Sequence, residues 1–232
     1  MTLPVDSMKP SVKWTERTMA ACRRERKELW IDAVDMFSPF LARYGVLADE
    51  PDAIDEAVQQ IAIHAKHLHD DASGLYRHIW CEQPDFYPES SLWSRGNGWM
   101  LTGMADTLRV LPENHEGRAA LEDRFVEHAA AIREVRDASG LWRNVLDDPH
   151  APLEVSGACQ FAHAFATGVQ LDLLPEDYAS LARETVEIVS GFVGNDGEVK
   201  RVALTPGGPG APIGGGAQGQ SWFLVAANTL AE

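Results

Sequence analysis

The sequence predicts an all-α fold of stacked helical hairpins, and three observations lead to that prediction. Apolar residues recur at three- and four-residue steps along most of the chain, strand-type alternation is scarce, and one nine-residue sequence occurs twice. That sequence is DASGLYRHI at 71–79 and DASGLWRNV at 137–145, and NDGEVKRVA at 195–203 is a fainter third copy. Each copy follows a predicted helix, so the repeating unit is a helical hairpin with one long loop. Such units stack into an open solenoid or into a closed double ring of helices, an α/α toroid.

The predicted helices follow this periodicity in order along the chain. The clearest is 53–69, where Ile54, Val58, Ile61 and Ala65 lie on one face of a helix. The others are expected at 29–44, 98–111, 119–135, 156–171, 177–192 and 221–230. Because the long loops of stacked hairpins gather on one face, we expect the functional residues there.

The last predicted helix is preceded by TPGGPGAPIGGGAQGQ, a glycine- and proline-rich segment at 205–220. By composition alone, this segment is also compatible with a flexible linker. Because an amphipathic segment follows it directly, we expect a long loop that closes back onto the helices. The chain is therefore expected to form a single domain over residues 1–232.

Composition narrows the possible partners and the location. The formal net charge of −15 and the pI near 4.9, without a compensating basic run, argue against nucleic-acid binding. Three widely spaced cysteines without a C-x-x-C pair are typical of reduced thiols, so we expect a cytoplasmic protein. The sequence shows neither a secretion signal nor an apolar run of about eighteen residues, so we expect no membrane association.

Several tryptophans fall at predicted helix–loop junctions beside polar residues. Trp30 is close to Asp32 in the sequence, and Trp93 and Trp99 flank Arg95. Flat aromatic faces next to hydrogen-bonding groups suit sugar rings, whose C–H faces stack while their hydroxyls bond. The alternative is that these large side chains only fill the junctions between helices.

Arg95 lies in a glycine-rich stretch that we expect to enter a helix. Gly96 and Gly98 precede an apolar-periodic run, which places Trp93 and Arg95 in the preceding loop and Trp99 in the first helical turn. Backbone amides at a helix N-terminus favour an anion, so a ligand carboxylate could dock beside Arg95. The alternative is a surface arginine that pairs with one of the 35 acidic residues.

His64, His67 and His69 form an H-x-x-H-x-H pattern of a kind that also occurs in metal sites. On a helix, however, His64 and His67 share a side, while His69 lies well round from His64. We therefore expect neither a metal nor another cofactor.

Five longer segments carry more specific information: LWIDAVDMFSPFLARYG, GLYRHIW, LWSRGNGWMLTGMADTLRVLP, GLWRNVLDDP and EVSGACQFAHAFATG. In this order they resemble successive motifs of the unsaturated uronyl hydrolases, glycoside hydrolase families 88 and 105. The resemblance covers roughly 29–170, and the glycine-rich segment with the last predicted helix resembles the C-terminal end of that family.

The resemblance implies an (α/α)6 toroid that removes the 4,5-unsaturated uronic acid left by polysaccharide lyases at a non-reducing end. The implied chemistry is hydration of the C4=C5 double bond, which does not need two opposed carboxylates. Asp32 in LWIDAVDM matches the catalytic acid/base, whose pKa apolar neighbours such as Trp30 and Met36 would raise. The sequence PVDSMKP at 4–10 is similar to the family's early acidic loop, which makes Asp6 a second active-site carboxylate.

The same resemblance assigns the substrate contacts and explains why one copy of the repeat carries a histidine. His78 matches a substrate-facing histidine, whereas Asn144 in the second copy is its structural counterpart. Arg95 matches a partner of a substrate hydroxyl or carboxylate. The complete set of expected substrate-binding residues is Trp30, His78, Trp93, Arg95 and Trp99.

The predicted helices are fewer than the roughly twelve of a complete six-hairpin ring. We therefore expect an incomplete toroid with an abbreviated N-terminal part, whose exposed edges a second copy of the chain would cover. The expected partner is an unsaturated uronic-acid oligosaccharide from pectin, rhamnogalacturonan or a related acidic polysaccharide. The alternatives are a non-catalytic or degenerate carbohydrate-binding toroid protein and a helical-repeat scaffold for other proteins.

Overall fold

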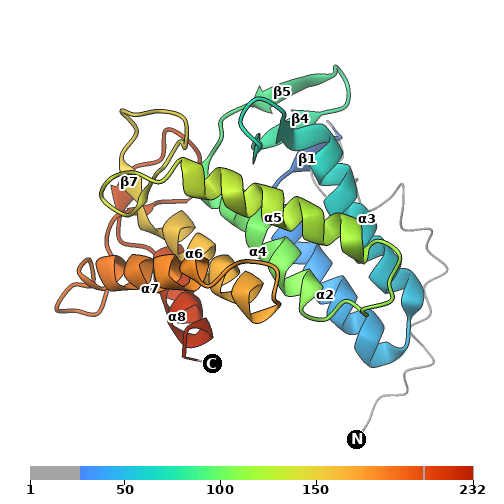
Figure 1. Cartoon of the computed structure of the whole chain (residues 1–232). Helices are drawn as coiled ribbons and strands as arrows, with labels where there is room; N and C mark the ends of the chain where they lie inside the picture. Colours follow the sequence, from blue (N-terminus) through green and yellow to red (C-terminus); the bar gives the residue numbers. More distant parts are fainter. Residues whose placement is uncertain (1–26, 206, 232) are drawn as a thin grey trace, which may run out of the picture.

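The computed structural model describes residues 27–205 and 207–231 (Figure 1). Its helices are Ala33–Ala48 (α2), Pro51–Leu68 (α3), Ser94–Leu108 (α4), Arg118–Glu134 (α5), Val155–Gln170 (α6), Asp177–Ser190 (α7) and Ala217–Thr229 (α8). Each of the seven predicted helices is confirmed, although α2 begins later than expected and α8 begins within the glycine-rich segment. Among the described helices, none has the length and apolar character that crossing a bilayer requires.

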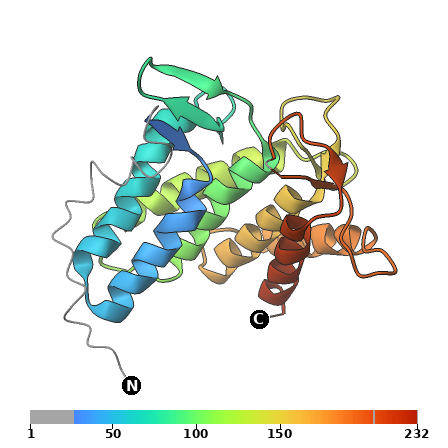
Figure 2. The same ribbon diagram turned by 180° about the vertical axis from the view of Figure 1, so that it is seen from behind.

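The helices form two layers (Figures 1 and 2). In one layer α2, α4, α6 and α8 pack side by side in succession, and α3 and α7 pack mainly on α2 and α6 in the other. Seen from behind, α2 (blue) and α8 (dark red) lie at the two ends of the row. This is the arrangement of hairpins in an (α/α)6 toroid, so the predicted fold class is confirmed.

The core lies between the two layers and is centred on α6. Every residue of α6 from Val155 to Gly168 is buried. The ring of Trp142 packs against Phe161 and Phe165 of this helix, with centroids 5.1 and 6.3 Å apart. Burying each such aromatic side chain stabilises the fold by roughly 1.5–3 kcal/mol. The rigid layer so formed supports the loops at its end.

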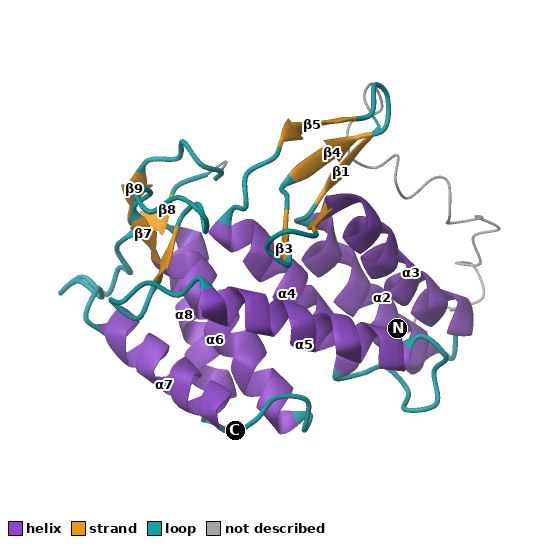
Figure 3. Ribbon diagram, turned by 45° about the horizontal axis from the view of Figure 1, so that its top comes forward, coloured by secondary structure: helices purple, strands orange, loops and turns teal. Residues whose placement is uncertain are grey.

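Short strands, which the sequence analysis did not predict, gather at one end of the helices (Figure 3). Glu28–Trp30 (β1), Ile79–Cys81 (β4) and Phe86–Glu89 (β5) form an antiparallel sheet in the order β1-β4-β5. Three two-residue pairs accompany it: His69–Asp70 with Leu75–Tyr76 (β2, β3), Trp142–Arg143 with Leu153–Glu154 (β6, β7), and Val202–Ala203 with Ile213–Gly214 (β8, β9). Strands of two to four residues are too short to show alternation in a sequence.

The repeated loop sequences occupy equivalent places in three hairpins. Each follows an outer helix: the first copy follows α3, the second follows α5 and the third follows α7. Each turns on a glycine with positive φ, at Gly74 (+72°), Gly140 (+85°) and Gly197 (+79°), a conformation that residues with a Cβ rarely adopt. The internal repeat predicted from the sequence is therefore a repeat of structure.

Asn97 of α4 fixes the first of these loops to the helical layer. Its amide donates to Tyr76 O (2.9 Å) and to Trp93 O (3.0 Å), and its oxygen accepts from Tyr76 N (2.8 Å). The same oxygen lies 3.1 Å from His128 Nε2, which must therefore carry the hydrogen. Complete burial lowers the pKa of His128 to about 3, so this ring stays neutral and the contact is a structural one.

Candidate active site

The pairing of β1 with β4 brings Asp32 and His78 together. Trp30 pairs with Ile79, and Ile31 N donates to His78 O at 3.0 Å, so the residue after β1 faces the residue before β4. Asp32 Oδ2 then lies 3.3 Å from His78 Nε2. Asp32 stands at the N-cap of α2, but within the described part of the chain its side chain makes no capping hydrogen bond. The carboxyl is therefore directed to His78 and to any bound ligand.

Burial differs between the two partners. The side chain of His78 is 8% exposed, whereas that of Asp32 is 36% exposed and reaches solvent. The two atoms approach closely without the alignment of a hydrogen bond, and neither His78 ring nitrogen has a hydrogen-bond partner among the described residues. Such unsatisfied groups beside a solvent-reaching carboxyl are typical of a ligand site.

Two tryptophans enclose His78. The ring of Trp30 meets it edge-on with centroids 5.5 Å apart, and the ring of Trp93 lies tilted at 4.7 Å. Trp93 Nε1 donates to Asn144 Oδ1 at 3.2 Å, so Trp93 is contacted by equivalent residues of the first and second repeat copies. His78 thus faces Asp32, while Asn144 is held in a hydrogen bond within the protein.

The beginning of α4 lies further upstream than we expected from its glycines. Trp93 is the N-cap, Arg95 is already in the first turn and Trp99 is in the second turn, so placing Arg95 in a loop was wrong. The glycines serve packing: a Cβ on Gly96 would lie 2.9 Å from the Trp93 ring, and one on Gly98 would lie 2.1 Å from Gln160 Oε1. A glycine within a helix can therefore mark a place where another side chain packs directly on the helix backbone, as well as a helix end.

Arg95 is buried, and its guanidinium already has protein partners. Nη1 donates to Ser156 Oγ (2.9 Å) and Ala203 O (2.8 Å), and it lies 3.8 Å from Glu154 Oε1. Burial lowers the pKa of Arg95, while the charges of Glu154 and Asp32 act in the opposite direction, so Arg95 is electrostatically close to the candidate acid. Its role as a substrate contact stays a prediction.

The glycine-rich segment returns to this site. Asn144 Nδ2 donates to Gly208 O at 2.9 Å, and Gly207 packs over Trp93 and Arg95. A Cβ on Gly207 would lie 2.5 Å from the Trp93 ring and 2.6 Å from Arg95 Nη2. The segment therefore covers the buried side of the site, with its backbone in direct contact with both side chains.

Replacing Gly207 by alanine should displace this segment. Gly207 (φ +89°) and Gly208 (φ +92°) share a left-handed backbone, so alanine strains both, at about 1–2 kcal/mol. At Gly207 the added methyl also meets Trp93 and Arg95, and such overpacking costs about 1–3 kcal/mol more. Urea unfolding should therefore show that Gly207→Ala lowers the free energy of unfolding more than the matched control Gly208→Ala. Equal losses would contradict the close contact.

Trp99 belongs to a neighbouring group of side chains further along the helical row. Its ring meets Trp222 of α8 at 5.6 Å, and Trp222 lies 5.8 Å from the ring of His163 on α6. His163 Nε2 lies 3.2 Å from Asp106 Oδ1 of α4. The predicted substrate-binding set therefore divides into residues around His78 and a tryptophan beside a second acidic group.

Asp35, which sequence analysis did not single out, lies between these two groups. It follows Asp32 by three residues on α2, and Thr102 Oγ1 approaches its carboxyl at 2.6 Å. Burial is the main cause that raises the pKa of Asp35 to about 6. The hydrogen bond from Thr102 and the charge of His163 lower this pKa, whereas the charges of Asp106 and Asp32 raise it. The second aspartate of LWIDAVDM was the available signal, since it shares a helix face with the first.

The remaining sequence expectations have mixed outcomes. Asp6 lies outside the described residues, so its place at the site stays a prediction. Met36 was expected to shield Asp32 from water, but its side chain is 52% exposed and does not do so. The three histidines of the H-x-x-H-x-H pattern have separate partners: Gln60 O for His64, the Trp80 ring for His67 and Asp71 for His69.

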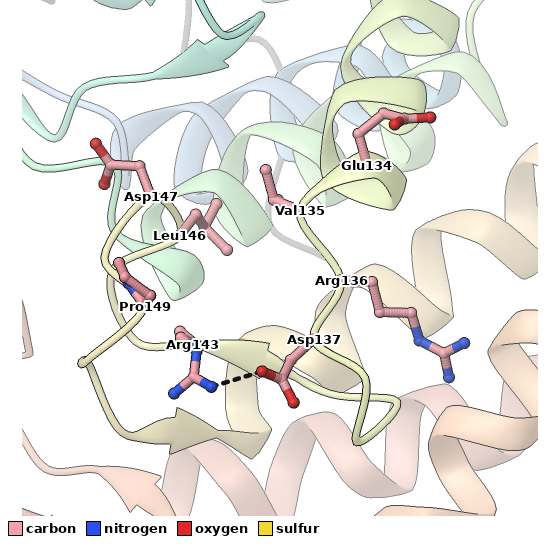
Figure 4. Close-up of a pocket in the computed structure, with 8 residues that line it drawn as sticks. All are labelled: Glu134, Val135, Arg136, Asp137, Arg143, Leu146, Asp147 and Pro149. Atoms are coloured by element: carbon pink, nitrogen blue, oxygen red, sulfur yellow. Dashed lines mark hydrogen bonds and ion pairs between the residues drawn. The ribbon is translucent and has the colours of Figure 1, made fainter.

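A hollow elsewhere on the loop face is distinct from this site (Figure 4). It is lined by Glu134, Val135, Arg136, Asp137, Arg143, Leu146, Asp147 and Pro149. Arg143 donates to Asp137 (2.6 Å) and to Ala151 O (2.8 Å), while Arg136 points away and donates to Glu184 (3.1 Å). The arginines of the hollow are thus engaged within the protein, and the group around Asp32 and His78 is the stronger candidate.

Comparison with known proteins finds relatives among the unsaturated glycuronyl hydrolases. The unsaturated rhamnogalacturonyl hydrolase YesR of Bacillus subtilis is 27% identical over 177 residues, which cover 76% of this chain and 50% of that protein. An unsaturated 3S-rhamnoglycuronyl hydrolase of Formosa agariphila is 30% identical over 183 residues, covering 73% and 48%. The chain thus spans about half the length of these relatives.

Solved structures give the same assignment for the fold. The crystal structure of a possible member of the GH105 family from Salmonella enterica superimposes with a TM-score of 0.81 at 28% identity. That match covers 87% of this chain and 56% of the other. Residues 5–213, which include every described residue of the candidate site except Trp222, match the family described as Glycosyl Hydrolase Family 88. The chain therefore belongs to Glycosyl Hydrolase Family 88.

Proposed function

We propose that this protein removes 4,5-unsaturated uronic acid from the non-reducing end of oligosaccharides made by polysaccharide lyases. The observation that carries the proposal is the close approach of Asp32 and His78, 3.3 Å apart, with the rings of Trp30 and Trp93 packed against His78. A carboxyl group that reaches solvent beside a histidine flanked by aromatic rings suits an acid acting on a sugar. Membership of the family and the names of its relatives support the same reaction class.

In the proposed reaction, the Asp32 carboxyl donates its proton to C4 of the unsaturated sugar. A water molecule adds to C5 and returns a proton to the Asp32 carboxylate, so one group serves as acid and then as base. The product is a hemiketal, which opens by breaking the bond from C5 to the ring oxygen and then releases the remaining sugar from C1. His78 Nε2, 3.3 Å from Asp32 Oδ2 and without a hydrogen-bond partner among the described residues, is placed to contact the bound sugar beside the acid.

Substrates from pectin or rhamnogalacturonan fit the proposal best. The two relatives compared above carry rhamnogalacturonyl and rhamnoglycuronyl hydrolase names, and both align with about three quarters of this chain. From the number and spacing of the cysteines, we further propose that the protein works in the reducing cytoplasm on imported oligosaccharides.

The decisive experiment follows the ultraviolet absorbance of the conjugated C4=C5 unit during incubation with several unsaturated uronides. Loss of absorbance in proportion to enzyme concentration supports the proposed reaction. Unchanged absorbance with all of them, together with calorimetric binding of one, would instead select the non-catalytic carbohydrate-binding alternative.

We also propose that two copies of the chain associate through α2. This helix exposes an apolar stripe at Met36 (52%), Phe40 (65%), Tyr44 (42%) and Leu47 (81%). These residues follow one another at steps of four, four and three, so they share one helix face, and the rings of Phe40 and Tyr44 stack at 6.3 Å. Contiguous apolar patches of this kind are typical of interaction surfaces.

A charge placed in this stripe should separate the copies. Phe40→Glu should lower the sedimentation mass to that of one chain, because an unpaired carboxylate cannot be buried cheaply. Val126→Glu, on the exposed face of α5, is the matched control and should leave the mass unchanged. A wild-type mass of one chain at all accessible concentrations would contradict the proposal.

A further inference from the structure

The candidate site continues one helical turn beyond Arg95. On α4, Trp99 follows Arg95 by four residues. On α6, Gln160 follows Ser156 by four residues. Since Arg95 donates to Ser156 at 2.9 Å, and side chains four apart lie one above the other on a helix, the next turns of the two helices also meet. A Cβ on Gly98 would lie 2.1 Å from Gln160 Oε1, so the Gln160 amide packs on the α4 backbone beside Trp99.

Polar atoms on this turn have no hydrogen-bond partner within the described residues. They are Trp99 Nε1 and both polar side-chain atoms of Gln160, a residue that is 0% exposed. Leaving buried donors and acceptors unpaired is costly, so native proteins keep such groups mainly where a ligand or a water molecule completes their hydrogen bonds. The same lack of partners marks the ring nitrogens of His78 in the candidate site.

Trp222 of α8 adds an aromatic side to this turn. Its ring meets the ring of Trp99 edge-on, with centroids 5.6 Å apart and an interplanar angle of 68°. Both tryptophans are partly exposed, whereas Gln160 is fully buried. Two indole rings nearly at right angles form an apolar corner against which the C–H face of a sugar can stack. The unpaired atoms of Trp99 and Gln160 thus accompany a surface that suits a sugar ring.

The following turns of these helices carry acidic groups that are already paired. Thr102 Oγ1 lies 2.6 Å from Asp35 Oδ1, and His163 Nε2 lies 3.2 Å from Asp106 Oδ1. The other ring nitrogen of His163 lies 2.8 Å from Thr229 Oγ1 of α8. An anionic group bound here would meet two carboxylates, and the imidazole between the helices already contacts one of them. The chemistry of this end of the site therefore favours a neutral, hydroxyl-bearing part of a ligand.

We propose that Gln160, Trp99 and Trp222 form the closed end of the sugar pocket and read the hydroxyls at C2 and C3 of the terminal unsaturated sugar. The proposal rests on the function proposed above and names the part of the substrate that this turn selects. A 4,5-unsaturated uronic acid has free hydroxyls only at C2 and C3. Neighbouring hydroxyls match a side-chain amide, whose oxygen accepts from one while its nitrogen donates to the other. Because the amide is 0% exposed, the partly exposed indoles turn aside as the sugar enters.

Replacing Gln160 by methionine separates recognition from packing. Methionine has a similar unbranched shape but cannot bond both hydroxyls, so the affinity for an unsaturated digalacturonide should fall roughly tenfold. Stability in urea should be unchanged or higher, because the variant leaves no amide unpaired in the core. Affinity is measured by calorimetry in an Asp32→Asn background, which prevents hydration of the ligand.

Gln60→Met is the matched control, because Gln60 is a buried amide that does have a partner. Its Nε2 donates to Glu56 Oε1 at 2.6 Å on α3. This variant should lose stability and keep the wild-type affinity, the opposite of the pattern expected for Gln160→Met. Unchanged affinity in Gln160→Met, or a loss of affinity together with a loss of stability, overturns the role of Gln160.

Two further measurements test the aromatic corner and the hydroxyls. Trp222→Ala should weaken binding of the digalacturonide roughly three- to tenfold, whereas Leu224→Ala, at a position of α8 that is 59% exposed, should not change it. The same digalacturonide carrying a 2-O-sulfate on its terminal sugar should bind at least about tenfold more weakly than the parent. Equal affinity for the two sugars overturns the reading of the hydroxyls.

Binding and turnover together separate failure of this proposal from failure of the proposed function. A wild type that hydrates none of the uronides, with binding that responds to Gln160 and Trp222 as expected, overturns the function and leaves the sugar site established. A wild type that hydrates the digalacturonide, with affinity that ignores both substitutions, overturns the site and leaves the function. A protein that binds no uronide overturns both.

Discussion

Asp32→Asn should lower the rate of uronide hydration by at least about a hundredfold, the loss typical of removing a general acid. Asparagine keeps the size and the hydrogen-bonding capacity of the side chain, but it cannot donate a proton to C4 or take one back from water. Because His78 and the flanking tryptophans remain in place, binding of the uronide should change little. The rate is measured by the absorbance of the double bond, and affinity by calorimetry.

Two control measurements are needed to interpret this result. Asp71→Asn removes a fully exposed carboxylate from the same loop face and should leave the rate unchanged. Urea unfolding of Asp32→Asn should show near-wild-type stability, since the Asp32 side chain caps nothing in the described chain and makes only the contact with His78. Activity retained in a folded Asp32→Asn protein would remove Asp32 as the catalytic group, even with the family assignment intact.

The helices were predictable from the sequence because each has a long apolar face that recurs every three or four residues. α3 is the clearest example, and its ends fall within two residues of the prediction. Most of β1 was absorbed into the predicted helix at 29–44, because Leu29 and Trp30 are as apolar as the helix that follows. Pairing with β4, 49 or more residues away, decides its conformation, and a local pattern does not contain that information.

The site was predictable only in part, for the same reason. Asp32 and His78 were named from motifs, and β1–β4 pairing brings them within 3.3 Å of each other. Asp35 was missed because its environment depends on Thr102 and on two groups from α4 and α6, which no spacing within α2 reveals. The start of α4 was misplaced because glycine was read as a loop signal, whereas here it makes room for Trp93 and Gln160.

Arg95 differs most between its expected and its observed surroundings. The sequence suggested an arginine open to a ligand carboxylate, but the structure places a protein carboxylate, Glu154, 3.8 Å away in the core. Glu154 also caps α6, accepting from Ser156 N at 3.0 Å and Gly157 N at 2.7 Å, and it accepts from Ala203 N at 3.0 Å. Arg95 and Glu154 therefore join α4, α6 and β8 behind the active site.

Arg95→Ala should consequently lower the free energy of unfolding by about 3–5 kcal/mol, the range for breaking a buried ion pair from one side. The loss arises because Glu154, 0% exposed, would keep its charge in the core without the cation that compensates it. Arg183→Ala, which removes one partner of an exposed pair with Glu176, is the matched control and should cost no more than about 1 kcal/mol.

A double-mutant cycle with Glu154→Gln tests whether the two effects share one cause. If the buried pair explains the loss, the double variant should be less destabilised than the sum of the single variants. A direct role in binding the uronate predicts the opposite pattern: near-wild-type stability for Arg95→Ala and an affinity weaker by about 1.5–3 kcal/mol, the range for hydrogen bonds to charged groups. Urea unfolding and calorimetry on the same preparations therefore decide between an arginine that holds the site together and one that holds the substrate.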